Sequence, residues 1–258
     1  MTWSFQDVNY RVFNRNPLVS TDIELRFHPI VRIATQKQDI ALFQDAVRGQ
    51  FPLYRQNNVR NVAMEPNGNF RVEDEVEHVF TDLNNADSIV LNQTSLRASS
   101  RDHQSRERLI AQFELGAKSL EQVFDGFSGH RLGLRYVNII DKAKISEETT
   151  EELNWEDLIS AEFLTTPHEI ADTANTNFMM ELRSNLNDRE GELALRYGLT
   201  QNQEGMPDHF RFDIDRYLSQ PEGIELQAAL DHLDSFARDI YSLFNTVVGE
   251  KLTKWMEH

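Results

Sequence analysis

Two aspartates in the last quarter of the chain have a spacing that suits metal-dependent phosphoryl chemistry. Asp213 and Asp215 lie two residues apart in the segment HFRFDIDRYL, residues 209–218. Residues i and i+2 of a strand point the same way, so the two carboxylates would share one face of a sheet. Clustered carboxylates bind divalent cations that promote phosphodiester hydrolysis. The segment therefore raises the hypothesis of a divalent-metal-dependent nuclease or phosphoesterase centred on this pair.

The neighbouring sequence favours a simpler interpretation of the same pair. The lysine that such a site needs does not follow the acids, because Arg216 stands after Asp215. Arg211 falls on the same face as the two aspartates, while the apolar residues between them face inward. Arginine–aspartate pairs between strands are common on the solvated face of a sheet. We therefore expect an exposed face with ion pairs, and we predict no catalytic residue and no metal ligand here.

Other chemical motifs are missing from the sequence. The chain has no cysteine, which excludes disulfides, thiolate metal sites and a cysteine nucleophile. Its eight histidines are isolated, the stretch GFSGH lacks the spacing of a serine-hydrolase elbow, and no phosphate-binding loop occurs. His78 falls on an apolar strand face, where a buried structural histidine is expected. We predict no cofactor, and an enzyme with an unfamiliar site stays an alternative.

An asparagine interrupts the apolar segment RLGLRYVNIID, residues 131–141. Both faces of this strand are largely apolar, which predicts a central strand. A buried amide without partners costs about 1–3 kcal/mol, so Asn138 must be hydrogen-bonded. It is either a structural strut or, together with Arg135 and Tyr136, part of a binding site.

The charge is strongly uneven along the chain. Residues 1–141 carry 16 basic and 18 acidic residues, whereas residues 142–258 carry 10 and 24, for a net charge of −16. An acidic surface repels nucleic-acid backbones, so direct nucleic-acid binding through the C-terminal half is disfavoured. The acidic face could simply aid solubility, dock a basic protein partner or mimic a nucleic acid. The densest acidic run is Glu147, Glu148, Glu151, Glu152, Glu156 and Asp157.

Hydrophobic periodicity predicts alternating strands and amphipathic helices. Strands are expected at 16–29, in a hairpin within 69–101, and at 129–141, 177–185, 191–200 and 209–218. Helices are expected at 38–52, 105–126, 150–164 and 222–256. These elements predict an α+β protein in which a mostly antiparallel sheet packs against long amphipathic helices.

The last helix carries the longest apolar stripe. A capping box from Ser219 to Glu222 predicts its start. The stripe between residues 226 and 247 should face the protein's own sheet, and a homodimeric coiled coil through this segment is the alternative. The chain is expected to form one α+β unit, and similar strand motifs in 1–141 and 142–258 raise the alternative of two related halves. With neither an expected membrane span nor a signal peptide, we expect a cytoplasmic protein.

Several of these segments, in this order, resemble a sporadically distributed prokaryotic family of similar length with no assigned function. The family shows a Pro-Leu/Ile-Val strand, a central R-x-x-L-R-Y-x-N-x-I strand, a late D-x-D strand and a C-terminal helix with a phenylalanine. The chain departs from it at Ser20–Asp22 and by lacking a tryptophan before the central strand. The matching residues are Pro17, Leu18, Val19, Arg131, Leu134, Arg135, Tyr136, Asn138, Ile140, Asp213, Asp215 and Phe244.

The resemblance implies a single α+β unit and supplies no activity. Its patchy distribution is typical of accessory systems such as antiviral or toxin–antitoxin cassettes. We therefore expect a non-enzymatic protein-interaction component that docks a basic partner through the acidic C-terminal half. The metal-dependent nuclease and a nucleic-acid sensor that uses the near-neutral N-terminal half are the alternatives. The candidate binding residues are Arg135, Tyr136, Asn138, Asp213, Asp215, Glu151, Glu152, Glu156 and Asp157.

Overall fold

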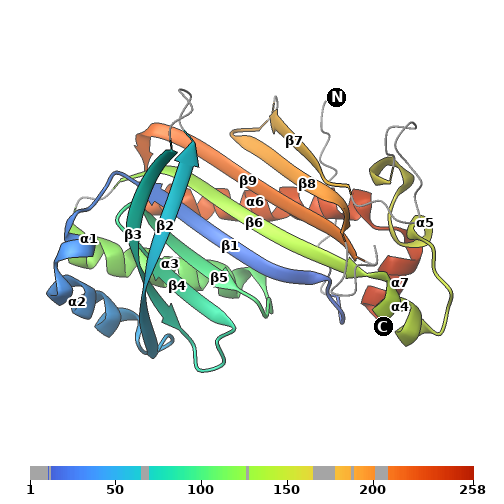
Figure 1. Cartoon of the computed structure of the whole chain (residues 1–258), viewed down its shortest axis with the longest axis horizontal. Coiled ribbons are helices and arrows are strands. Elements are labelled where there is room, and N and C mark those ends of the chain that lie inside the picture. The colour runs from blue at the N-terminus through green and yellow to red at the C-terminus, as the bar shows by residue number, and fades with distance from the viewer. Residues whose placement is uncertain are drawn as a thin grey trace. The chain divides into compact units, whose positions relative to one another are not determined.

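A nine-stranded sheet organises the fold, with strand order β2-β3-β4-β5-β1-β6-β9-β8-β7 (Figure 1). The computed structural model describes residues 11, 13–64, 70–125, 128–164, 178–186, 189–200 and 209–258. The pairs β1–β5, β2–β3, β3–β4, β4–β5, β7–β8 and β8–β9 are antiparallel. Seven α-helices accompany the sheet within this part of the chain. The predicted α+β class with a mostly antiparallel sheet is confirmed.

The elements follow one another along the chain in mixed order. The strands are β1 (Leu18–Phe27), β2 (Leu53–Met64), β3 (Phe70–Thr81), β4 (Asp87–Leu91), β5 (Ser95–Ser100), β6 (Gly129–Asp141), β7 (Met180–Asn185), β8 (Glu192–Thr200) and β9 (His209–Ile224). The helices are α1 (Arg32–Thr35), α2 (Lys37–Val47), α3 (Arg106–Phe124), α4 (Lys142–Thr149), α5 (Trp155–Leu158), α6 (Leu226–Val247) and α7 (Glu250–Glu257), and a 3-10 turn, η1, spans Ala161–Phe163.

The chain divides into two compact units, each built from separate stretches of sequence. Unit 1 contains residues 1–20, 134–218 and 234–258, and unit 2 contains residues 21–133 and 219–233. The alternative of two related halves, 1–141 and 142–258, concerns sequence rather than compactness and stays a prediction.

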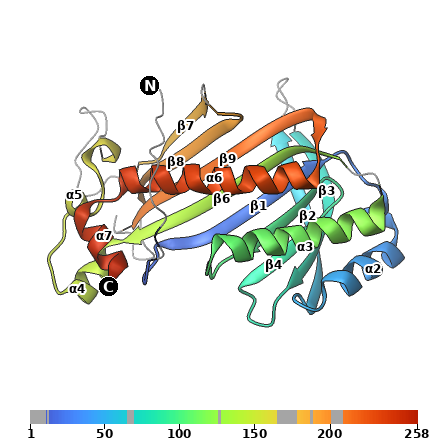
Figure 2. The same cartoon turned by 180° about the vertical axis from the view of Figure 1, so that it is seen from behind.

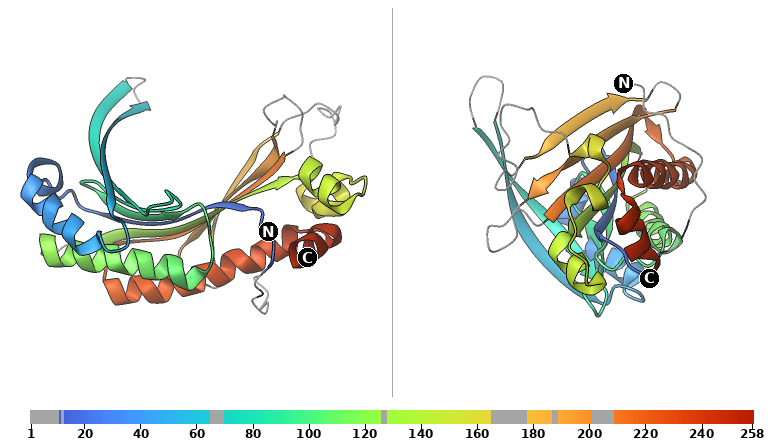
Figure 3. Two further views of the ribbon diagram at one scale, coloured as in Figure 1. Left: turned by 90° about the horizontal axis from the view of Figure 1, so that it is seen from below. Right: turned by 90° about the vertical axis from the view of Figure 1, so that its right-hand side faces the viewer.

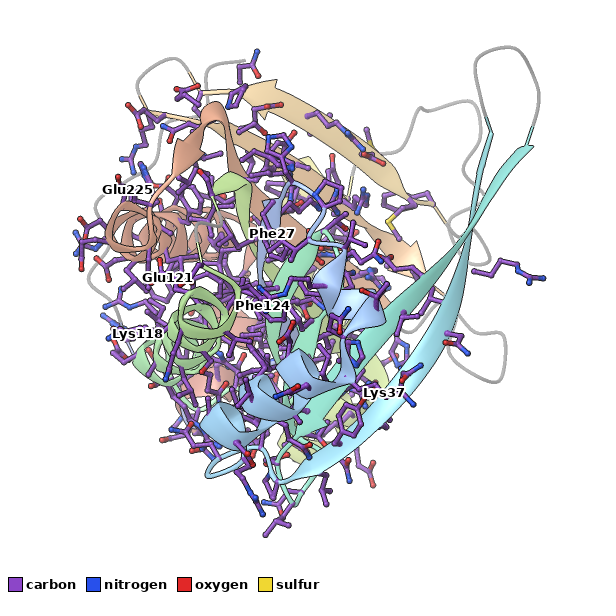
Figure 4. All side chains as sticks on the ribbon, turned by 90° about the vertical axis from the view of Figure 1, so that its left-hand side faces the viewer. Phe27, Lys37, Lys118, Glu121, Phe124 and Glu225 are labelled. Carbon is purple, nitrogen blue, oxygen red and sulfur yellow. The ribbon has the colours of Figure 1, made fainter. Side chains whose placement is uncertain are left out.

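In unit 2, α3 covers one face of the strands around β4 and β5 (Figure 2). Ser105 begins the helix by accepting a hydrogen bond from the backbone N–H of Arg108 at 3.1 Å. Gly116 brings the helix close to the sheet, since a Cβ there would lie 3.3 Å from Ile89 Cδ1. The predicted apolar stripe of this helix is buried, and Figure 4 shows Lys118 and Glu121 on the helix away from Phe124.

The opposite face of unit 2 is charged. Glu24 of β1 pairs across the sheet with Arg97 of β5, and Arg97 lies opposite Val90 of β4. Val90 in turn lies opposite Val79, which shares its face of β3 with Glu77. The β2–β3 hairpin curves away from α3, so β3 rises beside this charged face as a wall (Figure 3).

In unit 1, α6 packs on the face of β9 that carries Phe212. The rings of Phe212 and Phe244 lie 6.5 Å apart. On the same face, the buried guanidinium of Arg216 binds the buried carboxylate of Asp239 on α6, with Nε to Oδ2 at 3.1 Å. Arg189 also binds Asp239. The helix is thereby joined to its strand by an ion pair as well as by apolar contacts.

The C-terminal helix differs from the predicted one at both ends. β9 continues to Ile224, so Ser219 and Glu222 lie in a strand and the predicted capping box is wrong. Pairing between distant segments overrides the local helix signal. At its other end the predicted helix is interrupted near Gly249, which separates α6 from α7. A Cβ at residue 249 would lie 2.6 Å from the carbonyl oxygen of Asp157, so this close contact requires glycine.

The apolar stripe of α6 is largely used inside the chain. Leu233, Ala237, Ile240 and Val247 are all buried. The expected packing of this helix on the protein's own sheet is confirmed. A homodimer through residues 226–247 would use the residues of the helix that are not buried, which include the half-buried Leu226 and Leu230, and it stays a prediction.

Two further elements depart from the predictions. The helix expected at 150–164 is wrong, because the segment forms only the short α5 and η1, after a helix, α4, that was not predicted. Strand β2, LYRQNNVRNVAM, was also not predicted, because its polar sequence lacks alternation. It forms a strand by pairing with β3. None of the described helices combines the length and apolar character needed to cross a membrane.

Candidate functional site

The predicted aspartate pair does not form an exposed acidic site. Asp213 is only 2% exposed, so the expected exposed face is wrong at this position. Arg135 of β6 binds it with both nitrogens of a fork, Nε to Oδ1 at 2.7 Å and Nη2 to Oδ2 at 2.6 Å. Arg211 adds a bond to Oδ2 at 3.1 Å. The cross-strand arginine–aspartate pairing is therefore present, with the carboxylate buried and both arginine side chains partly exposed.

The two guanidiniums decide the ionisation of this carboxylate. Burial by itself would raise the pKa of Asp213, but the hydrogen bonds and charges of Arg135 and Arg211 outweigh burial and hold that pKa below its usual range. Asp215 is half-buried, and in register it lies opposite Ala194 of β8. Among the described residues no group of three or more metal-ligating side chains occurs, and Asp208 lies outside them. The described part of the chain thus supplies no ligand set around Asp213.

Asn138 and Tyr136 alternate with Arg135 along β6 and so belong to the opposite face of the strand. Asn138 is 4% exposed, and its Nδ2 donates to the backbone carbonyl of Phe212 at 3.3 Å. Tyr136 is half-buried. The geometry agrees with the strut interpretation of Asn138, since its amide joins β6 to the neighbouring strand. The five candidates on β6 and β9 are therefore divided between two faces rather than gathered in one pocket.

The acidic segment, residues 141–164, is held firmly against the C-terminal helices. Asp141 starts α4 by accepting the backbone N–H of Lys144 at 3.0 Å. Ile145, Leu153 and Leu158 are buried. At the start of α5, the carboxylate of Asp157 accepts the backbone N–H of Asn154 at 2.9 Å, which lowers the pKa of Asp157. The segment therefore presents its charges from a defined backbone.

Three of the six acids in the densest run are already paired. Lys251 of α7 contacts Glu151 at 3.1 Å and Asp157 at 3.4 Å. Glu148 accepts a hydrogen bond from Trp255 Nε1 at 2.8 Å and lies 3.3 Å from Arg15. These contacts fix the segment to α7.

The other three acids face solvent. Glu147, Glu152 and Glu156 are exposed, and no ion pair to them occurs within the described ranges. The six carboxylates differ in their contacts rather than in exposure alone. Glu148, Glu151 and Asp157 form a paired set, in which Glu148 and Glu151 are also exposed, and Glu147, Glu152 and Glu156 form an exposed set without an ion pair in the described ranges. The candidates Glu152 and Glu156 belong to the exposed set, whereas Glu151 and Asp157 belong to the paired set.

A groove of about 870 Å³ lies on the charged face of unit 2, and no sequence signal pointed to it. Its floor comes from β1 and β5, its wall from β3, and its ends from the loops around His28 and Gln93. Its charged and imidazole-bearing lining residues are Glu24, Arg26, His28, Glu75, Glu77, Arg97 and His130.

The rim of this groove is fixed by hydrogen bonds. Oδ1 of Asn92 accepts from the backbone N–H groups of Thr94 at 2.9 Å and Ser95 at 2.6 Å. The carbonyl of Thr94 accepts from Phe27 N–H and that of Gln93 from Ile30 N–H, both at 2.9 Å. The groove is therefore preorganised, which reduces the entropy lost when a ligand binds.

His78 is a core histidine, as expected. It is 5% exposed, with Nε2 3.0 Å from the carbonyl oxygen of Ile33 and Nδ1 3.0 Å from the hydroxyl of Tyr54. Burial lowers its pKa, although the bond to Ile33 partly offsets this. Its polar atoms are satisfied inside the fold.

Comparison of the sequence with family models and with curated proteins finds no match. The resemblance to the prokaryotic family stays a prediction.

Proposed function

We propose that the protein is a non-enzymatic interaction component that binds a basic protein partner through Glu147, Glu152 and Glu156. The observation that carries the proposal is the division of the acidic segment into paired and exposed carboxylates. The charges of the paired set are compensated by Lys251 and Arg15, while the exposed set leaves uncompensated negative charge at the surface of a segment anchored by buried apolar residues. Charges arranged in this way accelerate association with an oppositely charged partner.

The wider setting of this proposal comes from the resemblance. A cytoplasmic accessory system in a prokaryote, of antiviral or toxin–antitoxin type, is the setting we propose. The net charge of −16 supports a basic partner over a nucleic acid as the direct ligand.

The two sets of acids provide a matched test. The exposed-set variant is Glu147→Gln/Glu152→Gln/Glu156→Gln, and the paired-set variant is Glu148→Gln/Glu151→Gln/Asp157→Asn. A basic protein captured from the native host and identified is then used as the analyte in association kinetics. The exposed-set variant should associate more slowly at low salt and converge with the wild type as salt rises, because salt screens exposed charges.

The control has a different expected signature. Both variants lose three negative charges, so a purely global effect of net charge would slow them equally. The paired-set variant should lower the melting temperature and leave the association rate nearer to that of the wild type. Equal slowing of both variants, or none in the exposed-set variant, would contradict the proposed docking surface.

The metal-dependent hydrolase remains a second hypothesis with a simple measurement. A ligand that binds only the folded state raises the melting temperature. Because Arg135 and Arg211 already occupy the carboxylate of Asp213, we expect neither Mg²⁺ nor Mn²⁺ to raise the melting temperature of the wild type. A rise that disappears in Asp213→Ala would favour the hydrolase instead.

A further inference from the structure

The groove on the charged face of unit 2 has a net negative lining. Three carboxylates, Glu24, Glu75 and Glu77, line it together with the guanidiniums of Arg26 and Arg97. Its volume of about 870 Å³ lies within the range of about 300–1,000 Å³ that ligand sites occupy. The polar lining indicates a charged ligand rather than an apolar one.

The carboxylate on the floor of the groove is paired with two guanidiniums through one oxygen. Glu24 Oε2 accepts a hydrogen bond from Arg26 Nε at 2.8 Å and lies 3.5 Å from Arg131 Nη1. The charge of Glu24 is therefore largely compensated within the fold.

The wall presents a different carboxylate. The side chain of Glu77 is 19% exposed, and its ion pair with Arg97 spans 3.9 Å, which is beyond hydrogen-bond distance. No hydrogen bond to Glu77 occurs within the part of the chain that the structure describes. Its oxygens keep their capacity to accept, in a partly desolvated place where a charged donor is favoured.

A second carboxylate lies beside it on the same strand. Glu75 and Glu77 are two residues apart on β3, so both point to the groove. Thr94 Oγ1 donates to Glu75 at 3.4 Å, near the limit of hydrogen-bond distance. Glu75 therefore adds negative charge beside Glu77, which favours a positively charged donor group at the Glu77 carboxylate.

We propose that this groove binds an arginine side chain of the basic partner, with its guanidinium on the carboxylate of Glu77 and the charge of Glu75 beside it. The planar fork of a guanidinium carries five N–H donors and spans two acceptors better than an ammonium does. The inference deepens the proposed function, because it assigns a second contact to the same kind of partner. It uses residues of unit 2 alone, separate from the acidic segment.

The groove can be tested with a peptide probe and the full-length protein. The probe is a short capped peptide with one arginine among glycines and alanines, titrated while backbone amide signals are followed by NMR. The amide signals of residues 24–28, 30, 75–77 and 92–97 should shift. Glu77→Gln keeps the shape of the side chain and should weaken binding about fivefold or more, since it removes a charge-assisted contact.

Two controls separate a site from general charge attraction. Glu121→Gln/Glu225→Gln removes two exposed carboxylates of unit 2 away from the groove and should bind the probe as the wild type does (Figure 4). A peptide with citrulline in place of arginine keeps the shape without the charge and should bind at least about fivefold more weakly. A lysine peptide should lie between the two.

Several results would overturn the inference. These are equal affinity of the citrulline peptide, equal loss in the control variant, shifts that map outside the groove, or no binding up to the solubility limit of the probe. The exposed set on the acidic segment is intact in all of these proteins, so failure of the groove leaves the docking proposal to its own test. Conversely, if the peptide binds the groove and the exposed-set variant associates with its partner as fast as the wild type, the docking proposal is refuted and the groove proposal stands.

Discussion

Replacing Asp239 with alanine tests the interior of unit 1. The guanidinium of Arg216 is 2% exposed and the carboxylate of Asp239 is fully buried. Arg216 also donates to the carbonyl oxygens of Glu192 and Tyr217 at 3.3 Å, and it lies 4.5 Å from the ring centre of Phe236. Burial lowers the pKa of Arg216, but no accessible pH would neutralise it. The variant must therefore keep a buried cation without its anion.

The magnitude follows from that imbalance. Breaking a buried ion pair by removing one partner costs about 3–5 kcal/mol. The carbonyl oxygens around Arg216 still accept its N–H groups, which places the expected loss near the lower limit, at about 3 kcal/mol. In a chain of this size each kcal/mol shifts the melting temperature by about 2–4 °C, so the melting temperature should fall by about 6–12 °C.

Urea denaturation followed by circular dichroism measures the loss. The matched control is Asp234→Ala on the same helix, whose partner Arg238 is exposed, and it should cost less than about 1 kcal/mol. The double variant Arg216→Met/Asp239→Leu should be more stable than Asp239→Ala, because it removes the stranded charge together with its partner. The reasoning fails if Asp239→Ala costs no more than the control, or if the double variant is the less stable of the two.

Three other substitutions give separate checks. Asn138→Leu should lower the free energy of unfolding by about 1–3 kcal/mol, because it strands the carbonyl of Phe212; unchanged melting with lost partner binding would place Asn138 in a site instead. Because the pKa of His78 is lowered in the folded protein, the unfolded chain binds a proton at this residue more readily than the folded chain does. The free energy of unfolding measured with urea should therefore fall as pH decreases below about 6.5, and it should fall less in His78→Gln. Equal pH slopes in both proteins would exclude His78 as the cause. Asp213→Asn should cost about 1–3 kcal/mol at neutral pH, with the difference from wild type shrinking below about pH 4 as the wild-type carboxylate is protonated; a constant difference down to low pH would refute the ion pair with Arg135.

Local periodicity was enough to predict much of the fold. Strands β1, β8 and β9 and helix α3 carry alternation or an apolar stripe within their own residues, and all were predicted. β2 was missed because its own sequence lacks alternation. It forms a strand through its pairing with β3, which follows it in the sequence. The break at Gly249 was missed for the same reason, since the close contact is with Asp157, far away in the chain.

The candidate site depended even more on distant contacts. The burial of Asn138 followed from its apolar neighbours, but its acceptor, Phe212, is 74 residues away. Asp213 was expected to be exposed because a charged residue in a strand is usually solvated. The partner that allows its burial, Arg135, lies 78 residues earlier and cannot be recognised from the local sequence. The groove needs the register of β1, β5 and β3 together, which no single segment encodes.

The discontinuous make-up of the two units has a consequence for synthesis of the protein. Unit 2 begins at residue 21 but includes residues 219–233, and unit 1 needs residues from both ends of the chain. While the chain emerges from the ribosome, both strands of the β2–β3 hairpin and of the β4–β5 hairpin are synthesised early. Neither unit has all of its residues until at least residue 233 has been translated. Late, non-local pairing slows folding and prolongs the exposure of unpaired strand edges. A cut between residues 141 and 142 would therefore divide both units, and the two fragments should be recovered as a folded species only when they are produced together.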